Sequence, residues 1–418
     1  MDPAPVFKKV AWRLLPVLTL AYVFNYLDRN NIGFAALTMN REIGLTATQF
    51  GRGAGILFVG YCFLEVPSNL VLYRVGARVW LARIMISWGV ISAATIFVKG
   101  PWSFYFVRFL LGAAEAGFFP GVAFYLGHWF PAEYRTRVIA WFMVAIPISS
   151  VIGGALSGGL LQLHGMLGLS GWKWLFILEG LPVALLGIVV LAVLTERPEQ
   201  AAWLTDEEKR IVLAHVKGEV RHHEVRSLVP ALKDPRVLIL GAVQFGFLVG
   251  SYGVGIWLPQ IMKVGRLSDL EIGFLTSGVY TVASAAMILW ANHVDRGGNK
   301  AINLALSCAL GGAGLLGAIL SSNFWVSLGW LTLSLAGINA ARGIFFTIPM
   351  RFLTGVALAG GIAFINSIGT AGGFVGPSMM GWLTDRTGSF SAGLSMMAGF
   401  LLASAILAWT LRFFRGAE

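Results

Sequence analysis

The sequence predicts an all-α membrane protein whose twelve transmembrane helices form two halves of six. Composition is the first reason, because 57% of the 418 residues are apolar and only 12% are charged, whereas about 25% of the residues of a soluble domain are charged. The second reason is that apolar runs recur along the whole chain, each about as long as the ~20 residues that cross a bilayer as a helix. The third is one long polar interruption, residues 195–235, with six runs on either side.

The twelve expected spans follow these runs in order. They are residues 14–37, 53–72, 79–98, 103–129, 136–161, 173–194, 236–260, 270–291, 302–320, 324–348, 354–383 and 391–413. The first run has the basic flank of a signal sequence, but it is too long and no small-residue cleavage site follows, so we expect an uncleaved span. None of the runs has the ten-residue alternating pattern of a transmembrane β-strand.

The two halves repeat one another. A short polar turn with arginine and then glycine follows both the second span and the eighth span. Internal duplication among transmembrane helices is typical of secondary transporters, whose substrate site lies near mid-membrane between the repeats. We therefore expect a bundle of residues 1–194 and a bundle of residues 236–418, related by a pseudo-two-fold axis, with a central cavity between them. In the linker, Thr205 and Glu208 have capping-box spacing, which predicts an amphipathic helix on the cytoplasmic surface.

Lysine and arginine are distributed unequally between alternate loops. If the N-terminus is inside, most of them lie on the cytoplasmic side, where such residues accumulate. We therefore expect a multi-pass protein of the cell membrane, inner or plasma, with both termini cytoplasmic. The net charge of +11 then needs no nucleic acid to explain it, because nucleic-acid binding requires clustered basic residues on a soluble face. Cys62 and Cys308 fall within spans, which argues against a disulfide framework or a zinc site.

Six charged residues remain at membrane depth once the loop charges are set aside. They are Asp28, Arg29, Glu65, Arg108, Glu115 and Arg342. A charge at the bilayer centre costs about 3 kcal/mol even on an insertion scale, and such residues mark substrate or ion pathways. Each of them therefore needs a partner or water.

Helical geometry separates the first two of these charges. Asp28 and Arg29 are adjacent, so their side chains point about 100° apart on a helix. The face of Arg29 also carries Asn25 and Tyr26, a polar and aromatic stripe suited to lining a pathway. We therefore expect Arg29, whose guanidinium matches a carboxylate, to face the cavity, while Asp28 faces a neighbouring helix.

The charges of the fourth span cannot neutralise each other. Arg108 and Glu115 share a face but lie ~10.5 Å apart along the helix axis. We expect Asp28 to be the partner of Arg108, either as a purely structural salt bridge or as part of the mechanism. Glu115 is then expected to lack a fixed cation and to bind and release a proton.

Uncharged residues complete the candidate site. Tyr61, Tyr252 and Asn366 can supply polar groups from the second, seventh and eleventh spans, although any single aromatic residue in a chain with 13% aromatics is more often a packing residue. No Ser-His-Asp set, metal cluster or phosphate loop stands out in the sequence. The chain is therefore not expected to be an enzyme, and no cofactor or metal is implied.

Five segments together resemble a known family over essentially the full chain. They are "YLDRNNIGFAALTMN" (26–40), "GYCFLEVPSNLVLYRVGAR" (60–78), "RFLLGAAEAGFFPG" (108–121), "RTRVIAWFMVAIPIS" (135–149) and "GIAFINSIGTAGGFVGPSMMG" (361–381). In order and spacing they resemble the major facilitator superfamily and, within it, the anion:cation symporters. The resemblance is closest to bacterial permeases for tartrate, phthalate, hydroxyphenylacetate and related carboxylates.

The resemblance implies roles for the charged residues. Arg29 is expected to bind the substrate anion, and Asp28 and Glu115 to carry protons. Arg108 is expected to pair with Asp28. The residues expected to line the site are Tyr26, Tyr61 and Asn366, with Tyr252 as a further candidate.

The resemblance also points to the two repeated turns as gates on the cytoplasmic side, through Arg74, Asp295 and Arg296. Tyr73 stands where the superfamily usually has an acid, so the gate of the N-terminal half is expected to be held differently. Arg342 departs from the family as well, since a small or neutral residue is expected there. It is either a second anion contact or only a cytoplasmic charge.

Together these observations predict a proton-coupled symporter that imports a small organic anion by alternating access. The anion is expected to be a mono- or dicarboxylate such as tartrate, phthalate or another aromatic or hydroxy acid, and the protein to work as a monomer in the lipid bilayer. An organic-anion exchanger or an uncoupled facilitator is the alternative. A membrane sensor that only binds its ligand is a further one, but such proteins ordinarily append a soluble signalling domain, and the linker between the halves is short.

Overall fold

The computed structural model describes residues 3–218, 233–353 and 355–414, which are helical with short connections and contain no strand. The first group of helices is α1 (Ala4–Glu42), α2 (Ala47–Val75), α3 (Ala77–Ala94), α4 (Pro101–Glu115), α5 (Phe118–Gly127), α6 (Ala132–Met143), α7 (Ala145–Leu161) and α8 (Gly171–Val193). After α9 (Asp206–Gly218), the second group is α11 (Pro235–Lys263), α12 (Asp269–Asp295), α13 (Lys300–Leu320), α14 (Phe324–Phe345), α15 (Gly355–Thr387) and α16 (Ser391–Thr410).

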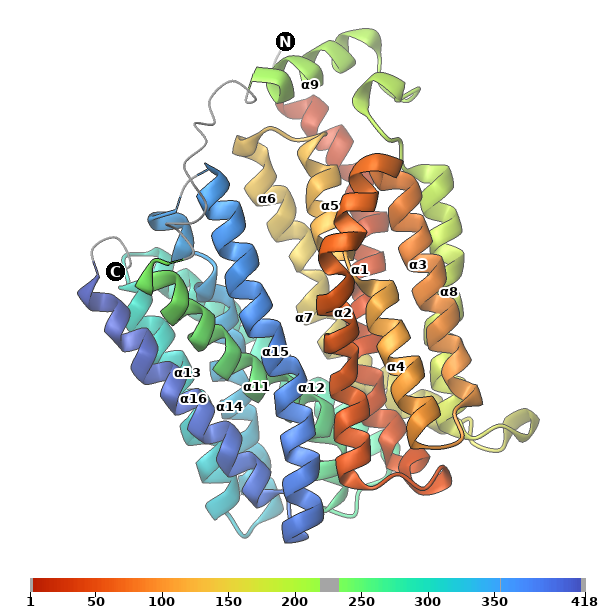
Figure 1. Cartoon of the computed structure of the whole chain (residues 1–418), viewed down its shortest axis with the longest axis vertical. Helices are drawn as coiled ribbons and strands as arrows, with labels where there is room; N and C mark the ends of the chain where they lie inside the picture. Colours follow the sequence, from red (N-terminus) through yellow and green to blue (C-terminus); the bar gives the residue numbers. More distant parts are fainter. Residues whose placement is uncertain (1–2, 219–232, 354, 415–418) are drawn as a thin grey trace.

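The predicted fold class is confirmed. In the described part of the chain, eleven helices or end-to-end helix pairs are long and apolar enough to cross a membrane. The twelfth long helix is α15, which packs between α2 and α11 and runs the length of the molecule (Figure 1). Two expected spans are each divided in two: residues 103–129 form α4 and α5, and residues 136–161 form α6 and α7.

Gly117 causes the first of these breaks. Its φ of 88° is left-handed, a conformation that glycine adopts readily. A Cβ at this position would also lie 2.5 Å from Ser68 Oγ. That hydroxyl donates to the carbonyl oxygen of Ala116 at 2.6 Å. The hydrogen bond satisfies a backbone carbonyl that the break leaves outside the helix. Glu115 therefore becomes the last residue of α4, at a helix end deep inside the protein.

The helices pack in two groups that meet along two seams. Helices α1–α8 pack with one another, as do α11–α16. The groups meet mainly where α2 packs on α15 and α7 on α12, and α1 also contacts α11 between these two seams. If the two halves are exchanged, the second span takes the place of the eighth and the eleventh that of the fifth. The contact of α2 with α15 then becomes the contact of α12 with α7. This pairing supports the predicted pseudo-two-fold relation between the halves.

Both seams are tightest at one end of the molecule, which we call the closed end. There the carboxylate of Asp385 accepts hydrogen bonds from the backbone N–H groups of Ala47 (3.1 Å) and Thr48 (2.7 Å) at the start of α2. A Cβ on Gly51 would lie 2.3 Å from the carbonyl oxygen of Pro377 on α15. Toward the opposite end, where α1 begins, the two groups diverge (Figure 1).

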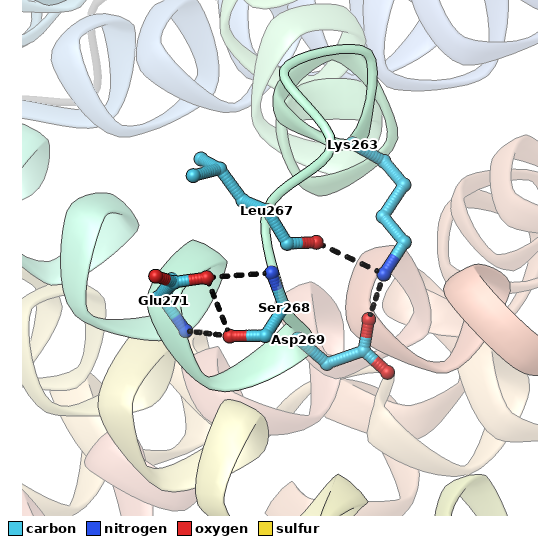
Figure 2. A network of polar contacts seen from close by, with 5 residues as sticks. All are labelled: Lys263, Leu267, Ser268, Asp269 and Glu271. Atoms are coloured by element: carbon cyan, nitrogen blue, oxygen red, sulfur yellow. Dashed lines mark hydrogen bonds and ion pairs between the residues drawn. The ribbon is translucent and has the colours of Figure 1, made fainter.

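A polar network fixes the turn between α11 and α12 at the closed end (Figure 2). Lys263 Nζ donates to Asp269 Oδ1 at 2.6 Å and to the carbonyl oxygen of Leu267 at 3.1 Å. Ser268 and Glu271 form a capping box at the start of α12. The network thus holds the first turn of α12 where it packs against α7.

Replacing Gly154 with leucine is expected to shift the protein away from this conformation. A Cβ at Gly154 of α7 would lie 2.6 Å from the carbonyl oxygen of Gly273 on α12, so a larger side chain must force the two helices apart. Spin labels would replace Trp102 and Leu320, which are 84% and 86% exposed. Double electron–electron resonance is expected to show a larger population of long distances between the two labels. Gly159→Leu is the matched control, because its Cβ would meet no atom within 4 Å. Identical distance distributions in the two variants would contradict the prediction.

The predicted linker helix is α9, which packs on the start of α1. Thr205 and Glu208 form the expected capping box: Thr205 N–H donates to Glu208 Oε2 (2.8 Å), and Glu208 N–H donates to Thr205 Oγ1 (3.2 Å). Lys9 Nζ lies 2.8 Å from Glu208 Oε2, and this hydrogen bond lowers the pKa of the Glu208 carboxyl. Residues 219–232 of the predicted linker lie outside the described residues.

Candidate functional site

The candidate site begins with an ion pair inside the first helix group. Arg29 Nε donates to Glu115 Oε2 at 2.9 Å, and the same oxygen accepts from Asn25 Nδ2 at 3.1 Å. The Glu115 side chain is fully buried, whereas that of Arg29 is 13% exposed. The expectation that Glu115 lacks a fixed cation is therefore wrong. Glu115 lies at the break after α4, and Asn25 and Arg29 lie one turn apart on the same face of α1, so both can reach its carboxylate.

Aromatic rings surround the Arg29 guanidinium. Its carbon lies 5.0 Å from the ring centre of Tyr61 and 5.7 Å from that of Tyr26. Tyr252 of α11 also interacts with this guanidinium, and its ring lies 4.3 Å from that of Phe58 on α2. Three of the predicted lining residues thus surround Arg29, one of them from the second helix group.

Asp28 points away from Arg29, as its position on the helix predicts. Its Oδ1 accepts hydrogen bonds from Asn31 Nδ2 (3.0 Å) and from Ser92 Oγ of α3. Its Oδ2 is buried and has no hydrogen-bond partner among the described residues. Asp28 is therefore held by neutral donors.

The predicted direct pair between Asp28 and Arg108 is not formed. Arg108 is 1% exposed, its Nε and Nη1 have no hydrogen-bond partner, and it makes no ion pair within 4.0 Å in the part of the chain that the structure describes. Its charge acts on both Asp28 and Glu115 at longer range. Asp28 instead accepts hydrogen bonds from Asn31 and Ser92 through Oδ1. Arg108 does not come close enough to reach Asp28 Oδ2, for which no described residue is a hydrogen-bond partner.

One buried acid was missed by the sequence analysis. Glu179 of α8 is 1% exposed, and its Oε2 accepts from Asn31 Nδ2 at 2.9 Å while its Oε1 accepts from Ser157 Oγ of α7 at 3.2 Å. Its position in the middle of the apolar sixth span is the sequence feature that could have identified it as a buried acid. In the described residues, no group of three or more His, Cys, Asp or Glu residues could hold a metal ion.

The second helix group contributes Arg342, near Tyr252, and Asn366, beside Gln244. Arg342 Nη2 donates to Ser251 Oγ at 2.7 Å, and the charge of Arg342 acts on Tyr252. Asn366 Oδ1 of α15 accepts from Gln244 Nε2 of α11 at 3.2 Å. Asn366 is thus partly buried beside α11, and the structure gives no contact of its side chain with Arg29.

The predicted gate residues lie apart from this centre, at the diverging end. Arg74, Asp295 and Arg296 are exposed, and none of them forms an ion pair within 4.0 Å with another described residue. Tyr73 is 76% exposed, and its ring lies 6.1 Å from that of Phe124. The two helix groups diverge toward this end (Figure 1), and gate contacts between them stay a prediction for another conformation.

Comparison with known proteins identifies the family. Residues 18–377 match the model of the Major Facilitator Superfamily. A protein named "Putative tartrate transporter" from Agrobacterium vitis is 49% identical over 406 residues, which cover 97% of this chain and 90% of the relative. The inner membrane transport protein RhmT of Escherichia coli is 35% identical over 412 residues, covering 97% of this chain and 95% of the relative.

A solved structure of similar fold is the D-xylose-proton symporter, with a TM-score of 0.77, 17% identity, and coverage of 97% of this chain and 98% of that one. At this identity the likeness concerns the fold alone. The family match and the relatives show that the chain is a multi-pass membrane transporter of small molecules and not an enzyme. The chain belongs to the Major Facilitator Superfamily.

Proposed function

We propose that this transporter is a proton-coupled symporter that imports a small organic anion, recognised by a carboxylate group. The observation that carries the proposal is the ion pair between Arg29 Nε and Glu115 Oε2 at 2.9 Å, at the centre of the protein. A carboxylate of the substrate and the carboxylate of Glu115 match the same guanidinium. The name of the 49% identical relative, a tartrate transporter, supports a carboxylate as the anion.

Competition for Arg29 links the proton to the anion. When Glu115 is ionised it neutralises Arg29, and an arriving anion has to displace it. When Glu115 takes up a proton its attraction for Arg29 is lost, and Arg29 needs another anion because an unpaired buried charge is costly. Proton binding and anion binding therefore favour each other, which is the thermodynamic requirement for symport.

We propose that the protein works as a monomer in the bilayer. Alternating access then arises when its two bundles, residues 1–194 and 236–418, rock against each other. We assign the end where α1 begins to the cytoplasm, on the basis of the distribution of Lys and Arg. The closed end is then extracellular, and the conformation is open to the inside. The anion and the protons would enter after the seams of α2 with α15 and α7 with α12 separate, and leave in the present conformation.

Arg342 is proposed as an anion contact from the second bundle. It is half-buried, its hydrogen bond is to the neutral Ser251 hydroxyl at 2.7 Å, and it makes no ion pair within 4.0 Å with a residue that the structure describes. Its charge and that of Arg29 both act on Tyr252, so an anion beside Tyr252 is near both arginines. A dicarboxylate could use one carboxylate for each.

Arg342→Gln is expected to raise the half-saturating concentration of tartrate by about tenfold or more, since a hydrogen bond to a charged group contributes about 1.5–3 kcal/mol. Uptake of gluconate, which has one carboxylate, is expected to change much less. Arg351→Gln, an exposed position beyond α14, is the control for loss of one positive charge. An equal effect on both substrates, or no effect on either, would show that Arg342 makes no specific contact with a second carboxylate.

The proposed function is tested by uptake into proteoliposomes. The labelled panel is tartrate, phthalate, 4-hydroxyphenylacetate, gluconate and nicotinate, each with and without an inward proton gradient. Accumulation of one acid only with the gradient is the expected result. Flux that ignores the gradient and requires internal anion would instead identify an exchanger, and gradient-independent flux without internal anion would identify a facilitator.

A further inference from the structure

We propose that Glu179 is an additional proton-binding residue of the transporter, coupled to Asp28 through the side-chain amide of Asn31. The inference rests on the proposed function, because it concerns where a proton-coupled symporter holds its protons. It deepens that function by adding a carboxyl that lies outside the pair of Arg29 and Glu115.

Asn31 bridges the two acids. Its Nδ2 donates to Asp28 Oδ1 at 3.0 Å and to Glu179 Oε2 at 2.9 Å. All three side chains are 1% exposed. The two carboxyl groups therefore share the hydrogens of one amide in a site without access to bulk water.

Among the described residues, no cation pairs with Glu179. Four helices supply the groups around the pair: Asp28 and Asn31 come from α1, Ser157 from α7, Ser92 from α3, and Glu179 from α8. Glu179 makes no ion pair within 4.0 Å with any described residue, and the charged neighbour that acts on it is the like-charged Asp28. Arg108 and Glu115 of α4 act on Asp28.

These surroundings favour one retained proton. A buried carboxylate without a cation is costly, and two neighbouring carboxylates that share a site do not both ionise readily. The hydrogen bonds agree with this, because neither Asn31 Oδ1 nor Asp28 Oδ2, both buried, has a hydrogen-bond partner in the part of the chain that the structure describes. The O–H of a protonated carboxyl on either neighbour is the donor that this part of the protein lacks.

The two acids would then hold their protons differently. When Asp28 ionises, its O–H bond breaks and the proton leaves toward the pathway, while Glu179 keeps its own proton. Asn31 Nδ2 only donates to the two carboxyl groups, so it offers no acceptor through which a proton could pass between them. Glu179 thus keeps one proton in the pair while Asp28 exchanges its own.

Infrared difference spectroscopy tests this without any substrate. The purified full-length protein in lipid is titrated with pH, and the C=O stretching band of protonated carboxylic acids is followed. We expect Glu179→Gln to lose one such band, while Ser157→Ala keeps it. Glu179→Asp, which retains a carboxyl, is expected to shift the band and not to remove it. A full set of bands in Glu179→Gln would overturn the proposal.

The proton-to-tartrate ratio in proteoliposomes is the second measurement. Glu179→Gln, which resembles the acid with its proton retained, is expected to keep the proton-to-tartrate ratio and to retain tartrate exchange at equal pH, whereas a purely structural role would lower uptake and exchange together. If the unmodified protein moves no protons with tartrate, the proposed function itself fails. If it does, and Glu179→Gln moves one proton fewer per tartrate, Glu179 releases its proton in every cycle and only the proposal of a proton retained on Glu179 fails.

Discussion

Arg29→Ala is expected to reduce tartrate uptake into proteoliposomes by about 30-fold or more. The substitution removes the cation to which the anion binds, and truncating one partner of a buried charge pair costs roughly 2–5 kcal/mol, with tenfold for each 1.4 kcal/mol. It also leaves the fully buried Glu115 without its 2.9 Å partner. The loss should therefore appear both in uptake driven by protons and in tartrate exchange.

Two further variants separate charge from folding. Arg29→Lys keeps the positive charge but not the fork of donors that matches a carboxylate, so it is expected to retain only a small part of the uptake. Arg83→Ala is the matched control, because Arg83 is a half-buried arginine of α3 that stacks over Trp80 at 3.8 Å and lies outside the candidate site. Normal uptake by a correctly inserted Arg29→Ala protein would refute the assignment of the anion site.

Glu115→Gln is expected to abolish accumulation of tartrate against its gradient while exchange at equal pH continues. Glutamine resembles protonated Glu115, so Arg29 stays available to the anion, but the side chain can neither take up nor release a proton. For each coupled proton, one pH unit supplies about 1.4 kcal/mol and therefore about tenfold accumulation. That contribution should disappear in the variant.

The comparison variant for Glu115→Gln is Glu42→Gln. Glu42 accepts from Trp172 Nε1 at 2.7 Å at the end of α1, away from Arg29, so the same chemical change there should leave accumulation intact. Uphill accumulation by Glu115→Gln at the normal level would remove Glu115 from the coupling mechanism. Loss of exchange together with accumulation would indicate that the carboxylate is needed to hold Arg29 in place.

The fold could be predicted from the sequence because membrane insertion imposes local rules. Runs of about 20 apolar residues have to be helices in lipid, where backbone groups must be satisfied within the segment. The same rules made charges such as Arg29 and Glu115 conspicuous, since polar groups are costly at that depth. The capping box of Thr205 and Glu208 was also predictable, because both partners lie within one helical turn.

The break at Gly117 could not be read in this way. A glycine within an apolar run is compatible with a continuous helix as well as with a break. The left-handed φ of 88° goes together with the close approach of Ser68 from another helix. As a result Glu115 lies at the end of α4, within 2.9 Å of Arg29.

The sequence by itself determined which faces of each helix carry charge, because helical periodicity orients a side chain relative to its own axis. It placed Asp28 and Arg29 on different faces of α1, and the structure agrees. Only the tertiary structure decided the partners: Arg29 pairs with Glu115 of α4, whereas Asp28 shares Asn31 with Glu179 of α8. The physical reason is that an ion pair forms within about 4 Å, and which helices approach that closely depends on the packing of the whole bundle.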